Sequence, residues 1–493
     1  MSYIHRHLLK NMGGESGHFE KLTREQILTL YKAGPEAIVS LIEYLQDRQS
    51  DIYRRLRDLE EQLQKNSRNS HKPPSSDGLK KIAKVRKLSG KKPGGQPGHE
   101  GNTLRLVDSP DTVTVHKVER CQHCGESLTK KKALQYDRRQ VFDLPAIQVQ
   151  VSEHRAEIKD CERCGKLSTA EFPQDVRHKV QYGPRLKANA AYIKSYGLLS
   201  YQRAAELLED LFGVALSAGT LVKMDREAAE RLEEVNQRIK QRITDSAIVH
   251  FDETGLRIEG KLHWLHVAGT QGLTYYLPHA KRGTEAFDAI GILPNFQGKA
   301  VHDGWSSYFK YLCDHVLCNA HHLRELTFLY EQEGQRWAKR MMEFLLEVKG
   351  KREKSKGQRF ASQTIRVFQQ RYHKILAMGM AAHPPALENV NRKRGRKKKS
   401  KAANLLDRLR RHEQATLAFM DDFSVPFDNN LGERDIRMMK VQQKISGTFR
   451  SFEGAVSFCR IRSYISTVKK QGMNVFSALQ DIFSDKRLLP QIC

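Results

Sequence analysis

Four short runs of sequence decide the fold: AIVHFDE at 247–253, KLHWLHVAG at 261–269, GLTYYLP at 272–278 and KAVHDGW at 299–305. The first three are rich in β-branched and aromatic residues and are separated by turns that contain glycine. This pattern predicts a meander of three strands. Helical sequence near Glu285 precedes the fourth run, and mostly helical sequence follows from about residue 320. We therefore expect a multidomain α+β protein.

Two of these runs carry a carboxylate at the predicted end of a strand, Asp252 in the first and Asp303 in the fourth. If the two strands are neighbours in one sheet, the two carboxylates lie together. With a third carboxylate from a helix they can bind two Mg²⁺ ions about 3.5–4 Å apart, an arrangement that drives in-line attack at phosphorus. We select Glu433, in DNNLGERDIRMMK at 428–440, as the third acid. Spacing alone does not exclude three rival glutamates: Glu253, Glu413 and Glu453.

The sequence around Glu433 predicts a helix that begins just before this acid. Asp428 or Asn429 is expected to cap that helix. Arg434 and Arg437 follow on nearby faces, so either guanidinium is a candidate phosphate contact.

Charge dominates the composition. The 493 residues include 84 Lys and Arg but 57 Asp and Glu, which gives a net charge of +27 and a pI near 9.7. Such a surplus favours a polyanionic partner, most often nucleic acid, because phosphate contacts release counterions. No stretch approaches the roughly 18 apolar residues of a membrane span, and residues 1–14 lack the apolar core of a signal peptide. We therefore expect neither a secreted nor a membrane protein.

The strongest local signal is a pair of CxxCG sequences. Strand-like alternation, VTVHKV and then IQVQV, precedes each pair in turn. The gap between the pairs exceeds the usual spacing of roughly 15–20 residues, so we expect a β-hairpin to bring them together. Four thiolates indicate a structural Zn²⁺, whereas a redox pair is the alternative. The expected zinc ligands are Cys121, Cys124, Cys161 and Cys164.

The N-terminal region combines a heptad repeat with a basic arm. Seven of eight seam positions between residues 38 and 63 are apolar, and Gln49 is the eighth. The repeat predicts a coiled coil and hence a dimer or larger oligomer, while an amphipathic helix packed on its own domain is the alternative. Residues 66–101, rich in Pro, Gly, Ser and Lys, are expected to follow a phosphate backbone or to serve as a solvated tether.

Three further features have open interpretations. Residues 199–224 read as two helices joined by a turn at Gly213, the outline of a helix-turn-helix. Trp305 can stack on a displaced base or pack beneath the acids, and the C-x-x-H pair Cys318 and His321 can bind metal or hold the neighbouring helices in place. The tract NRKRGRKKKSK at 391–401 is a phosphate contact or a solvated loop, with three adjacent lysines as candidates: Lys397, Lys398 and Lys399.

Several blocks resemble the signature blocks of insertion-sequence-66 family transposases. They are FDET at 251–254, HDGWSSY at 302–308, CNAHHLREL at 318–326 and DNNLGERDIR at 428–437, together with KPPSSDG at 72–78, GGQPGHEG at 94–101, the two CxxCG sequences and ISGTFRS at 445–451. The resemblance covers nearly the whole chain in the order expected for the family. Two features depart from the pattern: Gly432 directly before Glu433, and the long basic tract.

The resemblance implies a DDE transposase with an RNase H-like catalytic core. Asp252, Asp303 and Glu433 would be its three acids and would hold Mg²⁺ or Mn²⁺. The chain would bind the terminal inverted repeats of its own insertion sequence, cleave 3′ ends by hydrolysis and join them to target DNA by transesterification. This would take place in the bacterial cytoplasm and nucleoid, with or without accessory proteins of the element. A zinc-containing DNA-binding regulator and a metal-dependent nuclease without strand transfer are the alternatives.

These patterns predict six segments along the chain. They are an N-terminal coiled-coil segment (1–66), a basic arm (67–110), a zinc-binding domain (111–180), a helical region (181–245), a catalytic core (246–440) with a helical insertion at about 325–425, and a helical tail (441–493).

Overall fold

The computed structural model describes residues 23–66, 68–70, 104–145, 147–355, 357–384 and 399–484. The chain divides into two compact units, each built from two segments. The helical unit consists of Met1–Lys80 and Cys318–Phe427, and the sheet unit of Lys81–Leu317 and Asp428–Cys493. The basic arm from residue 71 to 103 and the basic tract up to residue 398 lie outside the described residues. No described helix has both the length and the apolar character of a membrane span.

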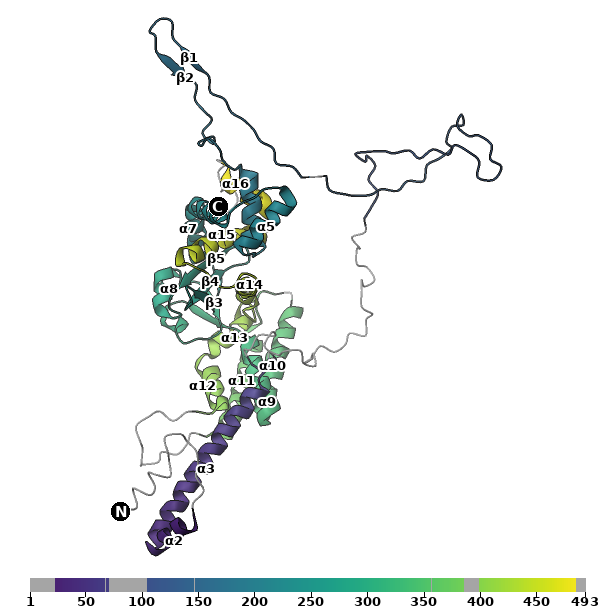
Figure 1. Ribbon diagram of the computed structural model, residues 1–493. Coiled ribbons are helices and arrows are strands. Elements are labelled where there is room, and N and C mark those ends of the chain that lie inside the picture. The colour runs from purple at the N-terminus through teal and green to yellow at the C-terminus, as the bar shows by residue number, and fades with distance from the viewer. Residues whose placement is uncertain are drawn as a thin grey trace. The chain divides into compact units, whose positions relative to one another are not determined.

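The sheet unit is built around five strands in the order β5-β4-β3-β6-β7 (Figure 1). β3, β4 and β5 are antiparallel neighbours, which confirms the predicted meander. β6 pairs parallel to β3, so the first and fourth runs are neighbours, and β7 pairs parallel to β6. The strands are β3 (Ile248–Ile258), β4 (Lys261–Gly269), β5 (Thr274–His279), β6 (Lys299–His302) and β7 (Asp314–Leu317).

Helices cover both faces of this sheet, and β3 contributes alternate side chains to each face. Val249 and Phe251 belong to an apolar cluster with residues of α7, α8, α15 and α16. Leu256 and Ile258 belong to a second cluster with α14 and α15. In Figure 1, α8 and α14 lie on opposite sides of the strands. The helices are α4 (Pro184–Ala191), η2 (Tyr192–Tyr196), α7 (Glu233–Thr244), α8 (Thr284–Ile290), η3 (Leu293–Asn295), η4 (Tyr308–Lys310), α14 (Asn430–Ser446), α15 (Phe452–Lys470) and α16 (Val475–Phe483).

The predicted pair of helices at residues 199–224 is present. α5 (Tyr201–Phe212) ends at Gly213, whose φ of +66° lies in the left-handed region that favours glycine. α6 (Ala218–Arg231) begins after Ser217, whose hydroxyl accepts a hydrogen bond from the Thr220 N–H at 3.1 Å. The helical geometry is therefore confirmed, and direct reading of DNA by it stays a prediction.

Residues 104–180 contain little regular structure. Within their described part, the only strands are β1 (Ile158–Asp160) and β2 (Leu167–Thr169), which flank the second CxxC pair. The runs VTVHKV and IQVQV do not form strands, so that prediction is wrong. Their apolar side chains are exposed, as Val151 is at 88%, and therefore have no packed surface to stabilise a sheet.

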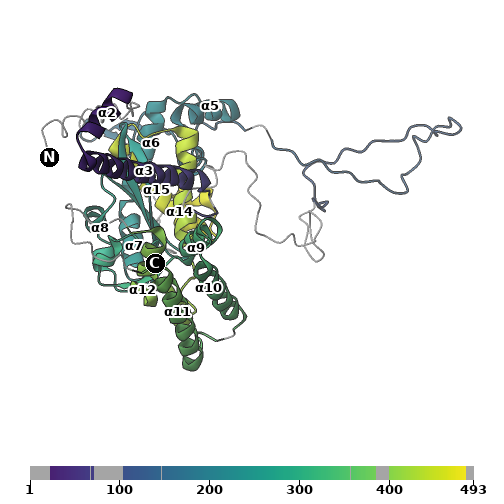
Figure 2. The ribbon, with the colours of Figure 1, turned by 90° about the horizontal axis from the view of Figure 1, so that it is seen from below.

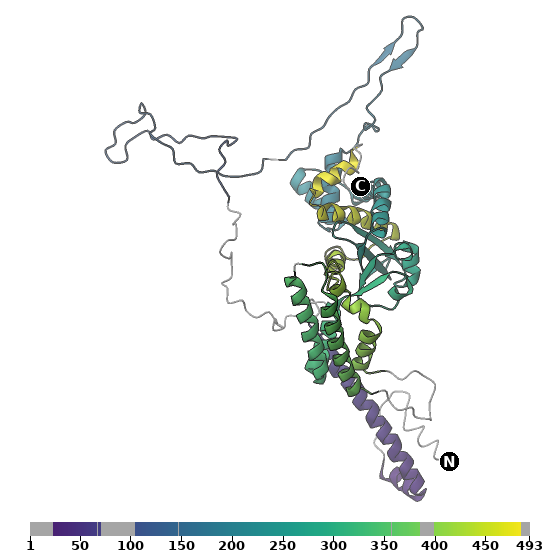
Figure 3. The same ribbon diagram turned by 180° about the vertical axis from the view of Figure 1, so that it is seen from behind.

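Within its described residues, the helical unit contains α2 and the 30-residue α3, followed by five helices from the second segment. Figures 2 and 3 show α10 and α11 packed side by side. The buried Asn319, in the CNAHH motif, donates its backbone N–H to the Phe427 carbonyl at 3.1 Å and its side-chain amide to the Thr416 carbonyl at 2.9 Å. The helices are α2 (Arg24–Lys32), α3 (Pro35–Gln64), α9 (Asn319–Glu333), α10 (Arg336–Lys354), α11 (Ser362–Ala382), α12 (Lys401–Arg411) and α13 (Glu413–Asp421).

Candidate active site

Asp252 lies in the middle of β3, whereas the sequence predicted that it would end a strand. The pairing of β3 with β6 stops at His250, but the pairing with β4 continues to Ile258. Asp252 is therefore two residues past the point where the parallel pair ends. Because side chains alternate along a strand, it lies on the same face as Leu256 and Ile258, the face that α14 covers.

Asp303 directly follows β6, as predicted. Its Oδ1 accepts a hydrogen bond from the Trp305 backbone N–H at 2.9 Å, so the carboxylate closes the turn that carries it. Gly304 has a φ of +89°, and its N–H donates to His302 Nδ1 at 3.0 Å. The other ring nitrogen of the buried His302 lies 3.0 Å from His315 Nδ1. These contacts hold the turn in one conformation.

Glu433 lies in the first turn of α14, and the helix begins where the sequence predicted. Of the two predicted caps, Asp428 accepts the N–H of Asn430 at 3.1 Å. Asn429 occupies the capping position without a side-chain cap, because its side chain bonds to β3 instead. The helix thus presents Glu433 beside the sheet face that carries Asp252.

The candidate acids influence one another through their charges. Burial raises the pKa of Asp252 well above its ordinary value, and the negative charges of Glu253, Asp303 and Glu433 raise it further. Three carboxylates are a donor set that suits Mg²⁺ or Mn²⁺. Among the described residues, no three His, Cys, Asp or Glu side chains are arranged to hold a metal ion. A bound cation would therefore have to draw these mutually repelling carboxylates closer together.

Glu253, one of the rival acids, points to the opposite face of β3 and is already paired. Its side chain is 2% exposed and forms an ion pair with Arg282 at 2.7 Å. The hydroxyl of Tyr308 donates to its second oxygen. Burial and then the charge of Asp303 raise the pKa of Glu253, while Tyr308 and Arg282 oppose that rise. The Glu253 carboxylate is therefore already paired with Arg282 and Tyr308, on the face of β3 opposite to Asp252.

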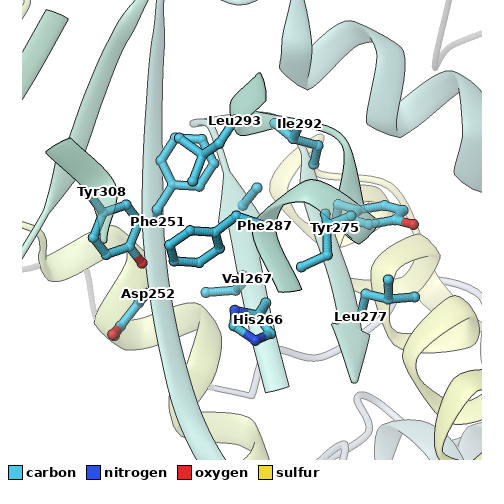
Figure 4. A pocket seen from close by; sticks show the side chains of 12 residues that line it. Phe251, Asp252, His266, Val267, Tyr275, Leu277, Phe287, Ile292, Leu293 and Tyr308 are labelled. Atoms are coloured by element: carbon cyan, nitrogen blue, oxygen red, sulfur yellow. The ribbon is translucent and has the colours of Figure 1, made fainter. Parts of the chain in front are cut away.

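Sequence reasoning missed Arg282 and Tyr308, although Tyr308 ends the HDGWSSY block. The Arg282 guanidinium carbon lies 4.2 Å from the centroid of the Trp305 ring and 5.0 Å from that of the Trp264 ring. Trp305 is thus packed against a cation, and its contact with a DNA base stays a prediction. Figure 4 shows Asp252 at the edge of an apolar pocket, with Tyr308 and Phe287 among its lining side chains.

The remaining rivals are engaged elsewhere. Glu413 belongs to the helical unit and lies 2.8 Å from His373. Glu453, at the start of α15, pairs with Arg226 at 3.0 Å. Glu433, by contrast, is among the charges that raise the pKa of Asp252. The choice of Glu433 thus has electrostatic support, and its catalytic role stays a prediction.

Residues 179–457 match the family described as "Transposase IS66 family", which spans more than half of the chain and all three candidate acids. The chain belongs to the IS66 family of transposases. Residues 119–165 match the zinc-finger binding domain of IS66 transposases, and residues 25–105 match a family of unknown function (DUF6444). No curated protein matches the chain.

The zinc finger of this IS66 transposase contains two separate knuckles. In the first, the Cys121 N–H donates to the Glu126 carbonyl at 2.8 Å, and Gly125 has a φ of +76°. In the second, the Cys161 N–H donates to the Lys166 carbonyl at 2.9 Å, and Gly165 has a φ of +65°. Hydrogen bonds from backbone N–H groups within each knuckle lower the pKa of the first thiol, Cys121 or Cys161.

These knuckles suit zinc by their donor chemistry, because a lowered thiol pKa favours the thiolate that zinc binds. The described residues do not bring the two knuckles together as one metal-holding group. The zinc-finger match therefore supports a zinc domain, while the joint four-cysteine site stays a prediction.

The basic residues predicted to contact DNA fall into two groups in this IS66 transposase. Arg434 and Arg437 are exposed on α14, immediately beyond Glu433. Lys399 forms an ion pair with Asp407, and Lys397 and Lys398 lie outside the described residues.

Cys318 is buried at the start of α9, in the helical unit.

Proposed function

We propose that this transposase cleaves and joins DNA at the ends of its own insertion sequence, using Asp252, Asp303 and Glu433. The observation that carries the proposal is the effect of both other acids on the pKa of Asp252. The charges of Asp303, at a strand end, and Glu433, on a helix, both act on Asp252 in its strand, although Glu433 is 130 positions from Asp303. A carboxyl pKa that is shifted by neighbouring charged groups is typical of functional sites.

The core that holds these acids is proposed to be RNase H-like. Support comes from the mixed sheet, in which a three-stranded antiparallel meander is extended by two parallel strands. Helices on both faces leave the acids between β3, the end of β6 and α14.

Two Mg²⁺ ions held by these carboxylates would supply an activated water or 3′-hydroxyl and would stabilise the leaving oxygen. The three acidic side chains would hold these ions in fixed positions. Asp252 and Asp303 are fixed by the backbone of the sheet, and Glu433 is fixed by α14. The nucleophiles are water and the freed 3′-hydroxyl, so no covalent protein–DNA intermediate is required.

DNA is proposed to lie along the exposed side of α14. Arg434, Arg437, Lys440 and Lys444 are all exposed there and follow one another at intervals of three or four residues. That spacing places four cations on one side of the helix, starting beside Glu433. The zinc domain, α5 and α6, and the basic segments around Lys397 and Lys398 are proposed to hold the terminal repeats.

Pairing of two element ends requires at least two protomers, and α3 is the proposed contact. Its heptad residues Ile42, Leu45, Ile52, Leu56, Leu59 and Leu63 are all exposed in the single chain. Such a stripe suits a second copy of the same helix. We propose that the reaction takes place in the bacterial nucleoid, with or without accessory proteins of the element.

The test is transposition of a marker flanked by the DNA that borders this gene. We expect wild type to insert the marker, and Asp252→Asn, Asp303→Asn and Glu433→Gln to bind DNA without inserting it. Glu453→Gln is the matched control, because its ion pair with Arg226 lies on the surface. Normal insertion by Glu433→Gln would refute the third acid. Cleavage without joining by wild type would favour the nuclease, and end binding without cleavage would favour the regulator.

A further inference from the structure

Asn429 is a buried polar residue that has no role in the proposed cleavage and joining of DNA. It is 2% exposed and directly precedes α14. Its side-chain amide donates to the Phe251 carbonyl at 2.8 Å. Its Oδ1 lies 2.7 Å from Nδ1 of the buried His250. Because the amide nitrogen is committed to a carbonyl, Oδ1 is the acceptor in the second contact and His250 Nδ1 is the donor. Asn429 therefore bonds to two consecutive residues of β3.

The same residue also bonds to the first turn of α14. Its backbone carbonyl accepts the N–H of Glu433 at 3.0 Å. The Phe251 carbonyl that its side chain holds belongs to the peptide unit that leads into Asp252. One asparagine thus links the backbone next to Asp252 with the backbone of Glu433, across 178 positions of sequence.

The glycine before Glu433 makes room for this link. A Cβ at Gly432 would lie 3.0 Å from Asn429 Oδ1 and 3.1 Å from its Nδ2, closer than nine in ten real contacts of a Cβ. Glycine is a poor helix former, so its presence in the first turn is otherwise unfavourable. The departure from the expected family pattern at this position therefore has a steric explanation.

We propose that Asn429 is a positioning residue that sets the separation of Asp252 and Glu433. The proposal rests on the proposed function of those two acids. Asn429 touches neither DNA nor metal in this role. It fixes α14 against β3, so that the two carboxylates stay at the separation that a shared pair of cations needs. Aspartate could not replace it fully, because a carboxylate would face the Phe251 carbonyl with no hydrogen to donate.

The test compares Asn429→Ala with Asn236→Ala in the full-length chain. Asn236 is a matched control: it is 4% exposed, and its side-chain amide bonds the Leu232 carbonyl at 2.9 Å and the Arg460 carbonyl at 3.2 Å, joining α7 to α15. The first readout is the single-turnover rate of 3′-end cleavage at saturating DNA and Mg²⁺. The second is hydrogen exchange of the backbone amides at the start of α14, which requires no activity.

For Asn429→Ala we expect the cleavage rate to fall on the order of 100-fold, as misplaced catalytic groups do, with DNA affinity unchanged. Amide exchange at the start of α14 should rise about tenfold or more, since a buried link is lost. Asn236→Ala should keep both the rate and the exchange of α14, even if its thermal stability falls equally. Asn429→Asp, which removes one hydrogen bond, should lie between wild type and Asn429→Ala.

Three results would overturn the proposal: wild-type cleavage by Asn429→Ala, an equal loss of rate in Asn236→Ala, or unchanged exchange at the start of α14. If wild type itself cleaves no DNA, the proposed function fails separately, and the exchange measurement decides the link alone. If Asn429→Ala does not fold, the same two measurements on Asn429→Asp decide it.

Discussion

Substitution of Gly432 by alanine should destabilise the sheet unit, although the same change stabilises most helices. An alanine in a helix is favoured over glycine by about 1 kcal/mol. At Gly432 the new Cβ would lie 3.0 Å from Asn429 Oδ1, 3.1 Å from its Nδ2 and 3.3 Å from its Cγ. If the Asn429 side chain moves away from this Cβ, we expect it to lengthen or break one of its two hydrogen bonds to β3, which measure 2.7 and 2.8 Å.

The size of the effect follows from what Asn429 would lose. Each buried donor or acceptor left without its partner costs about 1–3 kcal/mol. Even if only one of the two bonds is lost, this cost equals or exceeds the helix-forming gain. We therefore expect Gly432→Ala to lower the free energy of unfolding by up to about 2 kcal/mol, the unsatisfied-group cost of about 1–3 kcal/mol less the helix-forming gain of about 1 kcal/mol, and to slow DNA cleavage as Asn429→Ala does.

The assay is urea denaturation beside a matched control, Gly219→Ala, in the first turn of α6 of the same unit. A Cβ at Gly219 would meet only Ser217 Oγ at 3.7 Å, an ordinary contact. Gly219→Ala should therefore be neutral or stabilising. The double variant with Asn429→Ala completes a thermodynamic cycle. The reasoning is refuted if Gly432→Ala is as stable as Gly219→Ala, or if its cost persists when Asn429 is already alanine.

Three further predictions address other parts of the chain. Asp252→Asn should stabilise the chain by on the order of 1 kcal/mol at pH 7 without added Mg²⁺. Folding raises the pKa of Asp252, so ionisation of this carboxyl disfavours the folded state once the pH rises above the ordinary value of 3.8, and this loss of stability is complete above the raised pKa. Thermal denaturation at pH 4 and 7 should therefore show stabilisation by Asp252→Asn only at pH 7. Equal stabilisation at both pH values would contradict this. Tyr308→Phe removes the hydroxyl that donates to buried Glu253 and should cost about 1–3 kcal/mol in urea denaturation, with a change below about 0.5 kcal/mol counting against the pairing. Cys121→Ser should reduce the zinc content measured by metal analysis, whereas Cys459→Ser, buried in α15, should not; equal zinc in both variants would disprove the ligand assignment.

The meander was predictable because its signal is local. Alternating β-branched and aromatic residues with glycine turns depend on sequence a few positions away, and the structure contains all three strands. The position of Asp252 within β3 was not predictable in the same way. The strand continues past Asp252 because β4 pairs with it as far as Ile258, and the extent of pairing depends on the partner strand.

The residues that support the site could not be predicted from the sequence, because their partners lie far away along the chain. Arg282 meets Glu253 across 29 positions, and Asn429 meets His250 across 179. Nothing in the local sequence marks such partners. One signal was available: a glycine in the first turn of a helix, beside a candidate acid, indicates that another group occupies the space of its side chain.

The strand-like runs near the cysteines show the opposite failure. VTVHKV and IQVQV have the alternation of strands, but alternation yields a strand only where one face is buried. In the described residues of this region the apolar side chains have no such partner. The knuckles themselves were predictable, since a tight turn around CxxCG depends only on adjacent residues and a glycine with positive φ.

Because the sheet unit is built from two stretches of chain, its second stretch is synthesised well after its first. A ribosome that has made Asp303 must add 130 more residues before it reaches Glu433. At the usual rate of about 5–20 residues per second, this takes roughly 7–26 seconds. During that interval the segment Cys318–Phe427 emerges, whereas α14, which carries the proposed third acid, does not yet exist. Prematurely terminated products that end before α14 would therefore lack the proposed third acid. They would retain the zinc domain, α5 and α6, which we propose to hold the element ends, and would compete with complete molecules for those ends.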